Sequence, residues 1–243
     1  MLSTSIIQSI ITLIILLSAC ACASVTSGYL TAWLLKKMGD STAEDLGFLS
    51  FDIRVHGNLL GFICILLFGL GWKTSVPVNP LAFTGPYQKI RTLIAYSLAP
   101  LVSIYLAIIT LLITIIFLGP AIFMSSGSKL LAFGSVPIRS FISGTSPHYS
   151  SLALLIGLFL SATVIFNCFM AFIDIIFGII SACVALLYSR STGEVDDSYH
   201  FFMIRIIVPL VLMLLFGNKI FIFLLWVIQT AAYTIATFLG SLL

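Results

Sequence analysis

The sequence predicts an all-α membrane protein that crosses the bilayer several times as one domain over residues 1–243. Hydrophobic residues make up 60% of the chain, charged residues make up 8%, and the mean hydropathy is +1.22. Soluble domains carry about 25% charged residues, so this chain has too few polar side chains to cover a water-soluble fold. Long apolar runs separated by short polar connections are instead typical of a multi-pass integral membrane protein.

The charged residues and the cysteines exclude several other classes. Eleven Lys and Arg residues against eight Asp and Glu residues give a net charge of +3, and most of these side chains lie in the connections. This distribution predicts no nucleic-acid partner, because it contains no basic patch. The five cysteines all lie in apolar runs without the spacing of a metal finger. The predicted partner is therefore the lipid bilayer.

Six membrane spans are predicted, because a helix needs about 20 apolar residues to cross the hydrocarbon. The second is short enough to be a tilted or partial span, and the fourth is long enough for one tilted helix or for two helices bent near Gly178. The alternatives give a count of five to seven. The apolar runs are residues 1–35, 58–72, 92–118, 151–188, 201–216 and 220–239.

One segment has the pattern of a strand. Apolar and polar residues alternate strictly over residues 49–55, which predicts a half-buried β-strand or hairpin at the membrane interface after the first helix. Its backbone groups need partners. A free edge of this strand would bind an extended peptide, whereas a covered edge would be purely structural.

Four short motifs follow one another within residues 25–105. They are Gly-Asp-Ser-Thr-Ala at 39–43, His-Gly-Asn-Leu-Leu-Gly at 56–61, Gly-Trp-Lys-Thr-Ser-Val-Pro-Val-Asn-Pro at 71–80, and Ala-Pro-Leu at 99–101. Their order and spacing resemble the compact branch of the site-2 protease family, which are intramembrane zinc metalloproteases. The resemblance implies a site-2 protease-like core.

The residues that the resemblance would assign to zinc are absent. The family's His-Glu-x-x-His motif, which holds the metal and its general base, corresponds here to Ser27-Gly28-Tyr29-Leu30-Thr31. The family's third ligand would fall near residues 181–183, where no aspartate stands, and Asn58 replaces the aspartate of the second motif. We therefore expect a divergent member with neither a catalytic residue nor a metal or other cofactor.

Several polar residues remain candidates for binding. Ser27, Gly28 and Thr31 share a face of small residues, which predicts helix packing or a vestigial groove for a partner helix. Asp174 is the only acid deep in an apolar run, which predicts either a structural ion pair in the core or a site that contacts a ligand, a proton or a partner helix. Arg205 is its expected counter-ion. The complete set of binding candidates is His56, Asn79, Asn167, Asp174 and Arg205.

Three functions fit these observations. The first is a pseudoprotease that binds transmembrane or extended segments of other proteins without hydrolysis. The alternative is an active intramembrane metallopeptidase with a non-standard site, which would use Asp174 or His56. The third is a small ion-coupled transporter, which would use Asp174 and Arg205 and for which no internal repeat is visible.

Overall fold

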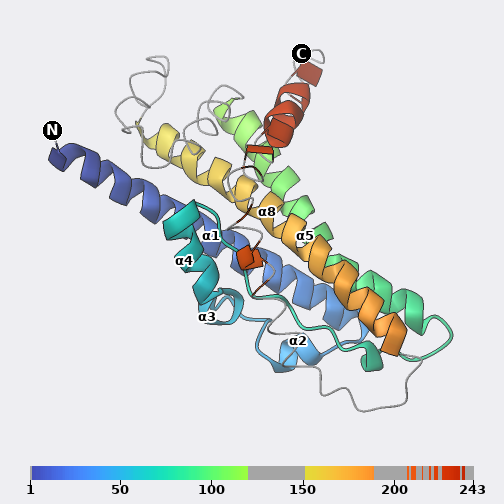
Figure 1. Ribbon diagram of the computed structural model, residues 1–243. Helices are drawn as coiled ribbons and strands as arrows, with labels where there is room; N and C mark the ends of the chain where they lie inside the picture. The colour runs from blue at the N-terminus through green and yellow to red at the C-terminus, as the bar shows by residue number, and fades with distance from the viewer. Residues whose placement is uncertain are drawn as a thin grey trace.

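The computed structural model describes residues 2–119 and 151–188, together with separate positions between 207 and 238. These residues are mostly helical, and the three longest helices are α1 (Leu2–Met38), α5 (Gln88–Leu118) and α8 (Ser151–Tyr188) (Figure 1). Each contains an apolar stretch that is long enough to cross a bilayer. This agrees with the predicted class of helical membrane protein, and α8 is one continuous helix rather than two.

The second predicted span is not of this kind. The second apolar run contains α4 (Leu59–Phe68), which has ten residues. At 1.5 Å per residue it covers about 15 Å, roughly half of the hydrocarbon thickness, so it is too short for a full span. The last two predicted spans, residues 201–216 and 220–239, lie largely outside the described residues.

Besides α4, three short helices lie between α1 and α5. They are α2 (Thr42–Asp45), α3 (Ile53–His56) and the 3-10 helix η1 (Pro80–Ala82). Each has a side-chain oxygen at or just before its start that accepts a hydrogen bond from a backbone N–H. The Asp40 carboxylate accepts a hydrogen bond from the Thr42 N–H at 3.0 Å beside the first turn of α2, and the Asn79 side chain accepts one from the Leu81 N–H at the start of η1.

The predicted strand over residues 49–55 is wrong. Residues 53–56 form α3 instead, and the part of the chain that the structure describes holds only an isolated antiparallel bridge, between Gly57 and Lys73. The physical reason is Asp52. Its carboxylate accepts a hydrogen bond from the Arg54 N–H at 2.9 Å, and such a cap favours a helical turn over a strand that has no ladder partner.

The three long helices pack against one another. Helices α5 and α8 run antiparallel and side by side, and α1 contacts both of them. Helix α5 contains the buried Pro100. On α8, a Cβ atom added to Gly178 would lie 2.9 Å from the Tyr96 carbonyl oxygen, so the glycine permits a close approach of the two backbones. Gly178 thus marks a helix crossing rather than the predicted bend.

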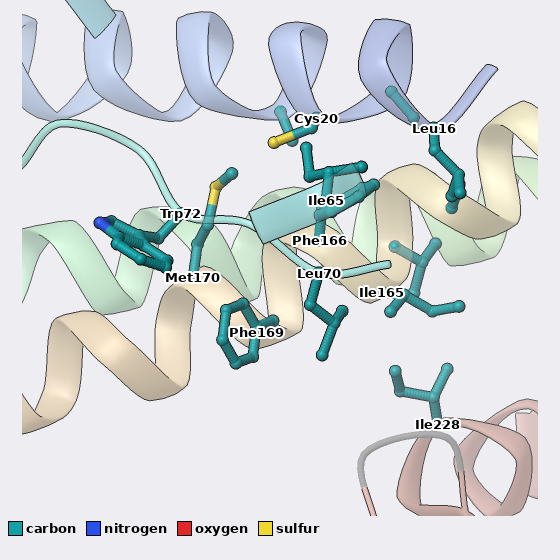
Figure 2. Packing of buried hydrophobic residues seen from close by; sticks show 14 of the residues in the cluster. Leu16, Cys20, Ile65, Leu70, Trp72, Ile165, Phe166, Phe169, Met170 and Ile228 are labelled. Atoms are coloured by element: carbon teal, nitrogen blue, oxygen red, sulfur yellow. The ribbon is translucent and has the colours of Figure 1, made fainter. Parts of the chain in front are cut away.

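Two apolar clusters form the core. The larger one lies between α1, α4, α5 and α8. In it Leu70 and Trp72 pack beside Phe169 and Met170, with Cys20 of α1 opposite (Figure 2). The smaller one lies near the C-terminal end of α1 and consists of Ala32, Leu35, Ala43, Phe48, Val76, Phe83 and Ala95.

After α4 the chain turns back along the helix that it has just formed. Gly69 ends α4 with a φ of 74°, in the left-handed region that glycine favours. The returning segment then contacts α4 through backbone atoms. A Cβ atom added to Gly61 would collide with the Trp72 backbone, and one added to Gly71 would collide with the Gly61 carbonyl. This contact allows non-helical backbone to lie inside the bundle, where protein atoms cover it.

Replacing Gly61 by alanine is expected to destabilise the protein by about 1–3 kcal/mol, because the added methyl group overpacks a contact between two backbones. The midpoint of thermal unfolding in detergent micelles measures the effect. Leu67→Ala is the control, because the Leu67 side chain is exposed on α4 and its loss should change stability by less than about 0.5 kcal/mol. Equal midpoints for the two variants would contradict the close contact.

Candidate functional site

The most notable polar site is centred on the side chain of Lys73. Its Nζ atom lies 3.0 Å from Ser27 Oγ of α1, 3.1 Å from Ser103 Oγ of α5 and 3.0 Å from an Asp174 carboxylate oxygen of α8. All four side chains are buried. We call these four residues the Lys73 cluster; it joins the three long helices to the segment that follows α4.

The backbone around Lys73 is fixed by its neighbours. The Gly57–Lys73 bridge holds it beside the start of α4. The next residue, Thr74, donates its N–H to the His56 carbonyl at 2.8 Å and its hydroxyl to the Gly57 carbonyl at 2.9 Å. These bonds anchor the returning segment, so the long side chain of Lys73 reaches the centre of the bundle.

The cluster satisfies the Lys73 ammonium group completely. A lysine ammonium has three N–H donors, and three oxygen atoms from three helices lie within hydrogen-bonding distance. Asp174 supplies the opposite charge, and its carboxylate also accepts a hydrogen bond from Ser103 at 3.4 Å. A buried charge is tolerated only when it is paired and hydrogen-bonded in this way.

The geometry limits the chemistry that the cluster can perform. A serine hydroxyl beside a lysine amine is a nucleophile–base arrangement only when the amine is neutral. Here the Asp174 carboxylate is the counter-ion of an ammonium, so Ser27 accepts a hydrogen bond instead of losing a proton. The ammonium also repels any second cation. Among the described residues, no group of three His, Cys, Asp or Glu side chains is arranged to hold a metal ion.

The structure brings together two of the residues singled out from the sequence, Ser27 and Asp174, but not in the expected manner. Arg205, the expected counter-ion, lies outside the described residues, and Lys73 supplies the positive charge. Ser181, where the resemblance placed the third ligand, is buried two helical turns further along α8 than Asp174. Sequence reasoning missed Lys73 and Ser103. For Lys73, the signal in the sequence was that a lysine stands inside the motif at residues 71–80.

The small-residue face of α1 is used for internal packing. Ser27 contacts Lys73, and the Thr31 hydroxyl donates to the Ser27 carbonyl at 2.7 Å. The imidazole of His56 lies against Gly28, where an added Cβ atom would collide with the ring. Ser24, Ser27 and Thr31 are buried. This face is therefore a packing surface and not an open groove.

His56 is fully buried behind α1. Its Nε2 atom lies 2.8 Å from the Ser50 carbonyl and therefore carries the proton, while Nδ1 has no hydrogen-bond partner in the described part of the chain. Burial lowers the pKa of His56, and the nearby charge of Lys73 lowers it further, whereas the bond to Ser50 raises it. His56 is thus a neutral side chain that joins the loop before α3 to α1.

The two asparagine candidates do not lie in the cluster. Asn79 has a structural role, because it caps η1 and its backbone N–H donates to the Asp40 carboxylate at 2.8 Å. Asn167 is buried one heptad before Asp174 on α8 and donates its amide to the Thr163 carbonyl at 3.0 Å. Its Oδ1 atom has no partner among the described residues.

Comparisons of this chain with protein-family models, curated proteins and solved structures find no match in any of the three. The motifs in residues 25–105 and the geometry of the Lys73 cluster are therefore the features that point to a function.

Removing one charge of the Lys73–Asp174 pair is expected to destabilise the protein by about 3–5 kcal/mol, because the other charge is left buried without a counter-ion. Lys73→Met and Asp174→Leu each test this in unfolding titrations with a denaturing detergent. The double variant should lose less stability than either single variant, because no unpaired charge remains.

The exposed pair formed by Lys36 and Glu44, with 2.6 Å between the charged atoms, is the matched control for this cycle. Lys36→Met should cost no more than about 1 kcal/mol, because water screens an exposed pair. Additive losses in the Lys73→Met/Asp174→Leu double variant would show that the buried pair is not coupled.

The stability of the protein is expected to fall as the pH is lowered from 7.5 to 5.5. The pKa of His56 is lowered in the fold, so below about 6.5 the unfolded chain binds a proton that the folded chain resists. Thermal unfolding at several pH values measures this loss. His56→Gln keeps an N–H donor for Ser50 but does not titrate, so its loss over the same interval should be smaller. If His56→Gln lost as much stability between pH 7.5 and 5.5 as the original protein does, the loss could not be assigned to His56.

Proposed function

We propose that this chain is a site-2 protease-like membrane protein that binds transmembrane or extended segments of partner proteins without hydrolysing them. The observation that carries the proposal is the Lys73 ammonium group, which is hydrogen-bonded to Ser27 at 3.0 Å. In the resemblance to the protease family, Ser27 stands where the first zinc-binding histidine would be. A lysine side chain therefore lies where the resemblance would place a metal ion.

An ammonium group at the place of the metal ion is incompatible with metal-dependent hydrolysis there. Two unit charges of the same sign at 4 Å repel each other by about 4 kcal/mol at an effective dielectric constant of 20, and a divalent ion doubles that cost. The hydroxyl oxygens of Ser27 and Ser103 and one carboxylate oxygen of Asp174 are already bonded to Lys73. Neither a polarised water molecule nor a deprotonated serine is supplied by this arrangement.

The surfaces available to a partner lie outside the Lys73 cluster. Helix α4 is too short to cross the bilayer, yet it exposes large apolar side chains, including Leu59 at 76% and Leu67 at 68%. The returning segment contacts α4 through Gly71 and Trp72. Beyond Lys73 it is only half-buried between residues 74 and 80, apart from the buried Val76. A transmembrane partner that packs against α4 would come next to this segment.

Zinc analysis and a peptidase assay test the proposal against the alternative of an active metallopeptidase. We expect the purified protein, incubated with zinc and then desalted, to retain far less than one zinc ion per chain. A fluorogenic transmembrane peptide should show no cleavage that a chelator abolishes.

The Asp174→Asn variant is the control for both measurements. One zinc ion per chain that is lost in Asp174→Asn, together with cleavage that is lost in the same variant, would overturn the proposal in favour of the metallopeptidase. Zinc that remains equally in Asp174→Asn is bound elsewhere and leaves the assignment of the Lys73 cluster intact.

A further inference from the structure

One buried side chain anchors the chain between α2 and α4 to α1. From residue 49 to residue 60 every residue is half-buried or exposed except His56, which is fully buried. A second contact with α1 is a ring stack in which the centroids of Phe51 and Tyr29 lie 4.5 Å apart, and Phe51 itself is 71% exposed. We call residues 49–56 the α3 segment. Because so little of it is buried, it opens at a lower cost in free energy than the long helices do.

The His56 ring fits against α1 only while it is neutral. A Cβ atom added to Gly28 would collide first with Nδ1 of the ring, so this nitrogen faces the backbone of α1. Among the described residues Nδ1 has no hydrogen-bond partner, and the proton of the neutral ring lies on Nε2, which donates to the Ser50 carbonyl at 2.8 Å. A second proton would therefore lie on Nδ1, buried and without an acceptor, which is costly.

The charged groups around His56 also oppose a second proton. The Lys73 ammonium group acts on the ring from the returning segment and repels a positive charge, whereas Asp52 at the start of α3 attracts one. The Asp52 carboxylate is already paired with the Arg54 guanidinium at 2.9 Å, so it offsets the repulsion only in part. The α1 backbone beneath the ring and the ring of Phe48, with its centroid 5.3 Å away, carry no charge.

We propose that His56 is a pH-sensitive anchor: a proton on Nδ1 drives the ring off Gly28 and releases the α3 segment from α1, while the three long helices stay packed. The Lys73 cluster joins those helices, and none of its bonds passes through the α3 segment. The Thr74 N–H donates to the His56 carbonyl, so the released segment swings about this point. The anchor is independent of the proposed function, because it needs neither a partner segment nor the absence of hydrolysis.

Hydrogen–deuterium exchange of the full chain in nanodiscs, read by mass spectrometry at pH 7.5 and 5.5, measures the release. The reporters are the N–H groups of Val55, His56 and Gly57, which are hydrogen-bonded to carbonyl groups at the start of α3. Their protection factor compares the observed exchange rate with that of an unfolded peptide at the same pH. If the released segment titrates at the ordinary histidine pKa of about 6.5 and the anchored one takes up no proton, this factor falls by up to about tenfold. Peptides from α5 should keep their protection.

Two variants separate the anchor from a general effect of pH. His56→Gln keeps an N–H donor for Ser50 and takes up no proton, so the protection of its α3 segment should not depend on pH. Tyr29→Leu weakens the ring stack and leaves the histidine in place. Its α3 segment should therefore be less protected at both pH values and still show the fall of about tenfold.

A fall of the same size in His56→Gln would overturn the inference, because the proton would then bind elsewhere. An equal fall in the α5 peptides of the original protein would also overturn it, because the whole bundle would then loosen. NMR of the histidine ring nitrogens gives a readout that does not depend on a variant. The Nδ1 signal of His56 should change to that of a protonated ring over the pH interval in which the protection falls, and a ring that stays neutral there would contradict the anchor.

Discussion

The fold depends on neutralising one positive charge inside a membrane protein. Placing a lysine in the hydrocarbon region costs several kcal/mol unless the ammonium group finds an anion and further acceptors. Lys73 finds them on three different helices, in Ser27, Ser103 and Asp174. Turning any one of these helices by a single residue, about 100°, would carry its oxygen atom away. The pairing therefore favours one rotational setting of α1, α5 and α8 among the many that apolar packing alone would allow.

The same constraint explains the close backbone contacts around α4. A non-helical segment can lie at membrane depth only where protein atoms cover it. Gly61 and Gly71 let the returning segment lie directly against α4, and Gly28 lets the His56 ring lie against α1. Each glycine provides space that a side chain would fill, and together they bring Lys73 to the point where the three oxygen atoms meet.

The sequence predicts the membrane class and the long helices well, because these follow from local hydrophobicity and length. It also singles out Asp174, since an acid deep in an apolar run is rare. It does not predict the partner of Asp174, because Lys73 lies 101 positions earlier in the chain, at the start of a polar connection. The alternating pattern over residues 49–55 suggested a strand, yet the single carboxylate of Asp52 caps a helical turn there. The conformation of a short segment depends on individual hydrogen bonds of this kind. A pattern of apolar and polar residues does not reveal them.

Residues 73–79 have a mechanical consequence, because the segment is bonded at both ends. Lys73 lies in the buried cluster, and the Asn79 N–H donates to the Asp40 carboxylate in the loop after α1. A displacement of that loop that keeps the Asn79–Asp40 hydrogen bond therefore pulls on the segment and, through it, on the ion pair of Lys73 and Asp174. The loop and the ion pair are thereby linked through six residues, without any rearrangement of the long helices.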